Sequence, residues 1–97
     1  VYAATTSALR ALLPEAGTVY RLNEWGREGD FVYEASSTLP DDDGYCIIAQ
    51  SGRRLVRVNV REIEARWYGL TYDTQTDNTA KIRAARNAAR RMKWNLR

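Results

Sequence analysis

The residues of this chain that could take part in chemistry are mainly carboxylates, because none of its 97 residues is a histidine. Three acids follow one another at Asp41–Asp43, and two more, Asp73 and Asp77, stand four residues apart. A run of carboxylates could bind calcium, and a spaced pair could act as a general acid and a general base. Without histidine we expect neither a His-based catalytic triad nor a zinc site.

Each acidic group also has a structural interpretation, which the sequence favours. The run Asp41–Asp43 lacks the alternating ligand positions and the terminal Glu of an EF-hand loop, so we expect a solvated turn that ends at Gly44. Asp73 and Asp77 lie where a turn would lead into a helix, and turn formation and helix capping account for both. We therefore predict no catalytic residue, no metal site and no cofactor in this chain.

The single cysteine and the aromatic residues are further candidates for a site. Cys46 lies in the apolar run 45–49, which favours a buried small side chain over a reactive thiol. Aromatic rings could stack on sugars, and the candidates are Trp25, Tyr33, Trp67, Tyr68 and Tyr72. Because large aliphatic residues are few, we expect these rings in the core or at a subunit interface instead.

The basic residues gather at one end of the chain. Residues 77–97 hold seven basic groups and one acid, whereas the preceding 76 residues hold eight basic and eleven acidic groups. A basic stripe is expected at Arg83, Arg86, Arg90, Lys93 and Arg97. It could lie along phosphates, pair with carboxylates of an adjoining subunit, or face water. No aromatic residue alternates with it, so nucleic acid is not the favoured interpretation.

A long helix is expected to position these basic groups, after an extended segment at Trp67 and a turn. Nothing between Asp77 and about Trp94 breaks a helix, and five alanines there favour one. Thr76 is expected to be the N-cap, and Asp77 to place its charge where the helix dipole favours it. Three- and four-residue spacing predicts an apolar seam of Ile82, Ala85, Ala89, Met92 and Leu96.

The upstream residues predict a small mixed domain. A short helix is expected from Thr5 until Pro14 stops it. Alternation and turn residues predict strands at 18–22, 31–33, 45–49 and 55–58, the last two joined as a hairpin through Ser51-Gly52. The fold class is therefore α+β: a short N-terminal helix, an antiparallel meander of about four strands and a long basic C-terminal helix. We expect two units, 1–66 and 67–97, and no membrane span.

The segment 67–82 resembles the opening segment of pectate-lyase-like, right-handed β-helix proteins, which occur in phage tailspikes and in secreted polysaccharide lyases and hydrolases. Their pattern is aromatic-aromatic-Gly-Ala-Lys-Gly-Asp-Gly-x-Thr-Asp-Asp-Thr-Ala-x-Ile. The corresponding positions are Trp67, Tyr68, Gly69, Asp73, Thr76, Asp77, Thr79, Ala80 and Ile82. Tyr72 and Thr74 replace two glycines of the pattern, and Asn78 replaces its second Asp, so we expect the geometry of the turn to differ from the family's.

The N-terminal half is similar to a module that often precedes the β-helix in phage tail proteins. That module has a short helix ending in Leu-Pro, a Gly-Asp before an aromatic strand, a Ser/Thr loop, an acidic turn and a Gly-Arg hairpin. The corresponding segments here are 13–14, 29–33, 36–38, 42–44 and 52–54. They occur in the same order and lead directly into the segment 67–82.

These resemblances imply a non-enzymatic module at the N-terminal end of a phage tailspike or tail-fibre protein, located in the virion. They imply a homotrimer that contacts other tail or baseplate proteins and reaches host polysaccharide only through a downstream β-helix, which could itself be catalytic. Two alternatives stay open: the N-terminal cap of a secreted bacterial polysaccharide lyase or hydrolase, and a basic-helix nucleic-acid-binding module. The residues expected at the β-helix end or at an interface are Trp67, Tyr68, Gly69, Asp73, Thr76, Asp77, Asn78, Thr79, Ile82, Ala85, Ala89 and Met92.

Overall fold

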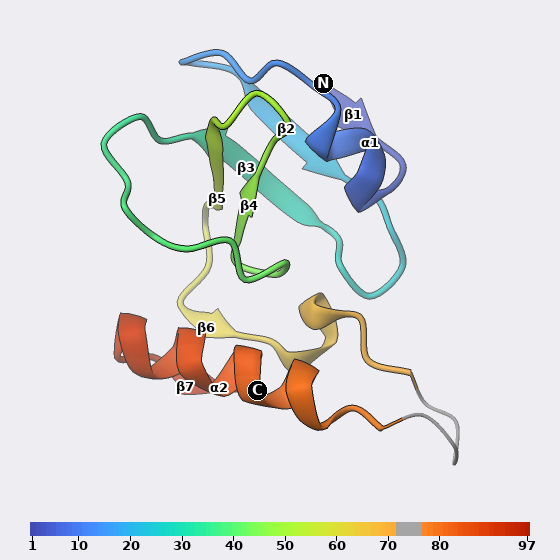
Figure 1. Cartoon of the computed structure of the whole chain (residues 1–97), viewed down its shortest axis with the longest axis vertical. Coiled ribbons are helices and arrows are strands. Elements are labelled where there is room, and N and C mark those ends of the chain that lie inside the picture. The colour runs from blue at the N-terminus through green and yellow to red at the C-terminus, as the bar shows by residue number, and fades with distance from the viewer. Residues whose placement is uncertain (72–76) are drawn as a thin grey trace.

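The chain folds as a small sheet with a long helix at the opposite end of the molecule, as the α+β prediction expected (Figure 1). The computed structural model describes residues 1–71 and 77–97. The elements are β1 (Tyr2–Ala3), α1 (Thr6–Arg10), β2 (Val19–Leu22), β3 (Gly29–Tyr33), β4 (Cys46–Ile48), β5 (Arg54–Arg57), β6 (Glu62–Ile63), the 3₁₀ helix η1 (Ala65–Tyr68), α2 (Thr79–Met92) and β7 (Asn95–Leu96). No helix in the described part of the chain is long and apolar enough to cross a membrane.

The larger sheet contains the four predicted strands, but in an order that differs from a meander. Its order is β1-β2-β3-β5-β4, so β5 lies between β3 and β4. The predicted β4–β5 hairpin forms, and its second strand pairs antiparallel with β3. The parallel strand β1 was not predicted, because two residues are too few to show an alternating pattern.

The first hydrophobic cluster lies between this sheet and α1. Phe31 and Leu55 on the sheet and Leu9 on the helix are completely buried. The hydroxyl of Thr5 caps α1 by accepting a hydrogen bond from the N–H of Ala8 at 3.1 Å. The helix ends at Arg10, well before Pro14, so the predicted helix was too long.

A second layer is built from η1, α2 and the short strands β6 and β7. These two strands pair in parallel, and Ile63 is the partner of Leu96. Helix α2 packs against η1, β6 and β7. Strand β6 lies within the expected unit 1–66, yet its partner β7 lies in the expected unit 67–97, so the two units share this sheet.

The long helix differs from its prediction in its bounds and in its buried face. It begins at Thr79 with Asn78 at the N-cap position, whereas Thr76, the predicted N-cap, lies outside the described residues. The helix ends where Lys93 adopts a left-handed conformation with φ of 58°. Leu96 therefore lies in β7 and is not part of a helical seam.

The seam itself is centred on alanines, one of which was not predicted. Ala85, Ala88 and Ala89 are buried, and Met92 is half-buried against the same cluster. Ile82, which was expected in the same seam, is 36% exposed. It lies in the first turn of α2, whereas the buried alanines lie in the middle of the helix.

Candidate functional site

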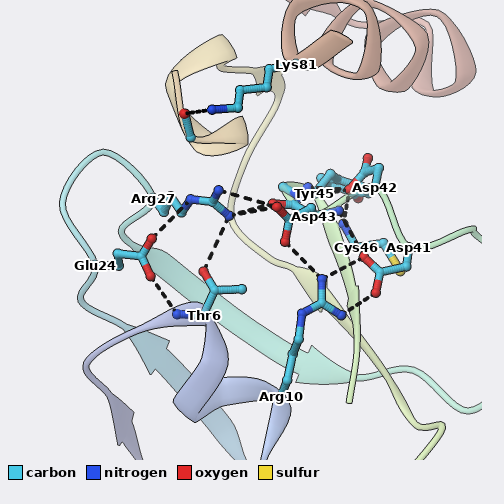
Figure 2. A network of polar contacts seen from close by, with 12 residues as sticks. Thr6, Arg10, Glu24, Arg27, Asp41, Asp42, Asp43, Tyr45, Cys46 and Lys81 are labelled. Carbon is cyan, nitrogen blue, oxygen red and sulfur yellow. Dashed lines mark hydrogen bonds and ion pairs between the residues drawn. The ribbon is translucent and has the colours of Figure 1, made fainter. Parts of the chain in front are cut away.

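The acidic run Asp41–Asp43 lies in the network of polar contacts that Figure 2 shows. Oδ1 of Asp42 accepts hydrogen bonds from the consecutive backbone N–H groups of residues 44–46, at 3.0, 2.8 and 2.9 Å. Its Oδ2 accepts a hydrogen bond from the hydroxyl of Tyr68 at 2.9 Å. The expected solvated turn therefore differs from the structure at Asp42, whose two oxygens are occupied by protein donors, whereas Asp41 and Asp43 are exposed.

The contact between this loop and η1 is close enough to require a glycine. The ring of Tyr68 lies against Gly44, and a Cβ atom added at Gly44 would come within 2.5 Å of it. Burial and the neighbouring Asp42 both raise the pKa of Tyr68, so its hydroxyl stays protonated and can donate. The acidic loop thus fastens the sheet to the second layer.

Asp41 completes the attachment of the loop to α1. Its side chain forms a bidentate contact with Arg10, and its Oδ2 accepts a hydrogen bond from the N–H of Ile48 at 3.1 Å. Although burial raises the pKa of Asp41, its hydrogen bonds with Arg10 and with the backbone lower it below the ordinary value. Arg10 also pairs with Asp43 at 2.9 Å. These contacts leave the loop bound to its own chain.

Arg27 extends the same network to the loop between β2 and β3 (Figure 2). It donates to the carbonyl of Asp43 at 2.9 Å and pairs with Glu24 at 3.2 Å. Glu24 in turn accepts a hydrogen bond from the N–H of Thr6 at 2.7 Å, in the first turn of α1. Within the described residues, no group of three or more Asp, Glu or Cys side chains could hold a metal ion.

A second connection between the layers is the buried side chain of Arg57, at the end of β5. Its guanidinium lies between two rings, 4.7 Å from the centroid of Phe31 and 4.1 Å from that of Trp67. It donates to the backbone carbonyls of Arg27, Glu28 and Gly44, at 2.7, 2.8 and 2.7 Å.

Arg57 was not among the residues that the sequence singled out. Burial lowers its pKa, while three carbonyls and two ring faces stabilise its charge. The alternation of β5 places Arg57 on the same side as the completely buried Leu55. That alternation is the signal that could have identified a buried arginine.

The predicted residues of η1 lie together where the sheet meets the second layer, a region that we call the junction. Trp67 and Tyr68 are buried, so neither ring is available to stack on a sugar. Gly69 follows them with φ of 76°, a left-handed conformation that suits glycine, and its carbonyl accepts a hydrogen bond from Nζ of Lys81 at 2.7 Å. Of the other sugar-stacking candidates, Trp25 is 77% exposed and lies outside the junction.

The start of α2 is joined to the segment after η1 by Asn78. Its side chain accepts a hydrogen bond from the N–H of Thr71 at 3.1 Å and donates one to the carbonyl of the same residue at 2.7 Å. Asp77 is exposed and accepts a hydrogen bond from the N–H of Thr79 at 2.9 Å, so it caps the helix from outside. Asp73, the other half of the predicted acid–base pair, lies outside the described residues.

The remaining candidates divide between this junction and the surface. Ala85, Ala89 and Met92 pack in the same cluster as the two aromatic residues of η1, whereas Thr79 and Ile82 are exposed. Cys46 is buried in that cluster as predicted, and burial raises the pKa of its thiol to about 11.

A hollow of about 420 Å³ lies beside β6 and is lined in part by Arg61, Glu64, Arg97 and Trp67. The indole Nε1 of Trp67 is buried and has no acceptor among the described residues. Buried N–H groups are almost always paired in folded proteins, so this one is an exception within the described part of the chain.

The fold is shared with several solved structures. The tailspike protein of Acinetobacter baumannii phage AM24 superposes with a TM-score of 0.75 at 23% identity, over 88% of this chain and 15% of that one. Tailspike protein 2 of the Escherichia coli O157:H7 bacteriophage CAB120 gives 0.73 at 18%, over 92% and 13%. Pantoea stewartii WceF, a glycan biofilm modifying enzyme with a tailspike-like parallel β-helix fold, gives 0.77 at 22%, over 95% and 14%.

These similarities show a common fold, and this chain spans only a small part of each of the three proteins. No curated protein sequence matches it. A family model does: the small four-stranded β-sheet domain of phage tail proteins matches residues 2–60, which include β1 to β5. Because the match covers more than half of the 97 residues, the chain belongs to the phage tail protein family of small four-stranded β-sheet domains.

Proposed function

We propose that this chain is the N-terminal module of a phage tailspike or tail-fibre protein and that its second layer closes one end of a downstream β-helix. The observation that carries the proposal is the parallel pairing of β6 with β7. Two neighbouring parallel strands joined by a long crossover are the unit from which parallel sheets are extended. Here the crossover contains α2.

The strand β7 has an exposed apolar side chain and a free edge, which favour pairing with a further strand. Leu96 is the partner of Ile63 and so shares its side of the sheet, yet Ile63 is completely buried and Leu96 is 38% exposed. Parallel sheets are normally covered on both faces, and an open strand edge attracts pairing. A further parallel strand beside β7 would cover Leu96 and continue the apolar column that begins at Ile63.

In this arrangement α2 covers the open end of the column. Its buried alanines allow the helix backbone to approach η1, β6 and β7 closely. The predicted cap residues Trp67, Tyr68 and Gly69 would then hold the helix in place from the side of the sheet.

The proposed role is attachment and closure, without catalysis in this chain. Asp41 and Asp42 are used in hydrogen bonds that hold the loop, which leaves no free carboxylate pair there. Recognition or cleavage of polysaccharide would belong to the downstream β-helix, and the fold shared with the glycan-modifying WceF supports this division. We further propose a homotrimer in the virion tail, in contact with other tail or baseplate proteins. The family match gives no support to the secreted alternative.

The proposal can be tested by changing Leu96 to Asp in two proteins, the 97-residue chain and the same chain with the downstream region attached. In the short chain Leu96 is partly exposed, so we expect little loss of stability. In the longer protein the carboxylate would be buried in the column, and we expect a lowered melting temperature and loss of the trimer in light scattering.

Val19→Asp is the matched control, because Val19 is 50% exposed and lies on β2 in the larger sheet, which does not contain β7. The control change should alter the melting temperature equally in both proteins. Equal melting of Leu96→Asp and the parent in the longer protein would contradict the β-helix closure, and a stable monomer of that protein would contradict the trimer.

A further inference from the structure

The outer face of α2 carries an unusual group of charges. Five basic residues of α2 and its C-cap are exposed and form no ion pair or hydrogen bond through their side chains with any described residue: Arg83, Arg86, Arg90, Arg91 and the C-cap Lys93. The first three are spaced three and four residues apart and therefore form one row along the helix. We call Arg83, Arg86 and Arg90 the arginine row.

Most basic side chains elsewhere in the chain have partners within it. Five arginines outside α2 form ion pairs with carboxylates of the chain: Arg10, Arg21, Arg27, Arg66 and Arg97. Arg57 instead is enclosed by rings and carbonyls. Arg53 and Arg54 donate to backbone carbonyls, and Arg61 is exposed without a described partner. The arginine row therefore gathers in one place a kind of unpaired charge that is rare among the other described residues.

The row cannot turn inward, because α2 is fixed at both ends and along its inner face. Lys81 holds the first turn to the carbonyl of Gly69. Beyond the C-terminus, the ring of Trp94 packs edge-on against Tyr45, with centroids 5.6 Å apart. The row is thus a permanent part of the surface of this chain.

The charges of the row oppose one another within the helix. Like charges three or four residues apart destabilise a helix by a few tenths of a kcal/mol. The helix dipole favours cations only in the last turn, where Arg90 and Arg91 lie, and gives no such benefit to Arg83 and Arg86. A partner of opposite charge would remove this repulsion, and arginine suits carboxylates because its planar group binds them through two hydrogen bonds.

A second copy of this chain does not supply that partner. Among the described carboxylates, only Glu15 and Glu34 have no ion pair or hydrogen bond through their side chains, against the five exposed cations of α2 and its C-cap. Single-stranded nucleic acids are bound by basic grooves in which aromatic rings stack on the bases, and α2 carries no aromatic residue. Ile82 lies beside Arg86, one turn earlier, and is 36% exposed, and an apolar residue next to arginines is typical of protein interfaces.

We propose that the outer face of α2 docks onto a carboxylate-rich surface of another protein, with the arginine row paired to Asp or Glu side chains of that partner. This interface is distinct from the β7 edge used in the proposed function. A failure of one therefore leaves the other unaffected.

The probe is a lactam-stapled helical peptide whose four glutamates stand three and four residues apart on one face. Its isomer carries the same residues with the glutamates spread around the helix. Fluorescence anisotropy at about 50 mM and about 200 mM salt measures binding to the 97-residue chain. We expect the matched peptide to bind at least about tenfold more tightly than its isomer at the lower salt. The two peptides have the same net charge, but only the matched one can place several glutamates opposite the arginines at once. Equal binding of the two peptides would overturn the proposal.

Two triple variants separate the row from net charge. The first changes Arg83, Arg86 and Arg90 to Gln. The second changes Arg21, Arg66 and Arg97 to Gln, and so removes the same charge from paired positions. We expect the first to lose at least about tenfold in affinity for the matched peptide and the second less than about twofold. Equal losses would show that only net charge matters and would overturn the proposal.

Competing occupants give distinct outcomes in the same assay. Tighter binding of a double-stranded DNA or of polygalacturonate than of the matched peptide would assign the row to those polyanions and overturn the assignment to a protein. Self-association in sedimentation that the first triple variant abolishes would assign the row to a second copy. Thermal melts confirm that both variants remain folded.

Discussion

The acidic loop 41–43 and the outer face of α2 are both rich in charge, but their charged side chains find partners in opposite ways. The loop turns its carboxylates inward, where backbone N–H groups, Tyr68 and Arg10 use them. Helix α2 leaves four of its five cations, Arg83, Arg86, Arg90 and Arg91, outside with no described partner. A cluster of charge in a sequence therefore does not reveal whether its partner belongs to the same chain, because backbone donors are invisible in the residue pattern.

The largest effect is expected for Asp42→Ala in the acidic loop. This change leaves three backbone N–H groups and the hydroxyl of Tyr68 without an acceptor, in a part-buried site. We expect a loss of about 3 kcal/mol in the free energy of unfolding, measured by urea denaturation. Asp43→Ala, whose side chain is 52% exposed, is the control and should lose less than about 1 kcal/mol. Similar losses in the two variants would show that the loop is not organised around Asp42.

A somewhat smaller effect is expected for Arg57→Met, which tests a cation that is turned inward. Methionine retains apolar packing between Phe31 and Trp67, but the three carbonyls that Arg57 binds lose their donor. We expect destabilisation by about 2 kcal/mol in the same assay. Arg53→Met is the control, because Arg53 lies over one ring only and is half-buried. A fully stable Arg57→Met protein would show that the buried charge is dispensable.

The pH dependence of the free energy of unfolding gives a third test, which concerns Asp41 in the acidic loop. The hydrogen bonds of Asp41 place its pKa below the ordinary 3.8 despite its partial burial. Its contribution to stability is therefore present above about pH 4 and is lost as the pH falls through the lowered pKa. We expect the difference in stability between wild type and Asp41→Asn to shrink between about pH 6 and about pH 3 in urea titrations. A difference independent of pH would contradict this assignment.

The smallest effect on stability is expected for the arginine row. Changing its three residues to Gln removes repulsion without breaking a described contact, so the melting temperature should stay the same or rise slightly. A clear decrease, measured by circular dichroism against the Arg21, Arg66 and Arg97 control, would show that the row has an internal partner after all.

The sequence predicted elements whose residues act locally. Alanines and the absence of breakers identified α2, and alternation identified the four longer strands of the sheet. It did not identify β7, since that strand depends on the left-handed turn at Lys93, a conformation that lysine rarely adopts. Predicting β1 and the position of β5 required the pairing of distant segments, which periodicity does not contain.

The junction was predicted in part, for a physical reason. Trp67, Tyr68 and Gly69 were found because a motif marked them, and they do lie together. Asp42 and Arg57 were missed because a charged residue is normally exposed, and only the folded chain shows the donors and carbonyls that make burial favourable. Helical spacing placed Ile82 on the seam, but Ile82 lies in the first turn of α2 and is 36% exposed, while Ala85, Ala88 and Ala89 further along the helix are buried.

Two polar contacts between the layers, which add to the apolar packing there, bear on how force would pass through the molecule. The only covalent link between the sheet and the second layer is the stretch between β5 and β6, residues 58–61. Alone, four residues would act as a pivot about which the layers could swing. The bonds from Tyr68 to Asp42 and the stacking of Arg57 on Trp67 brace that pivot. A torque applied to one layer is therefore transmitted to the other, and the two layers rotate together as one body.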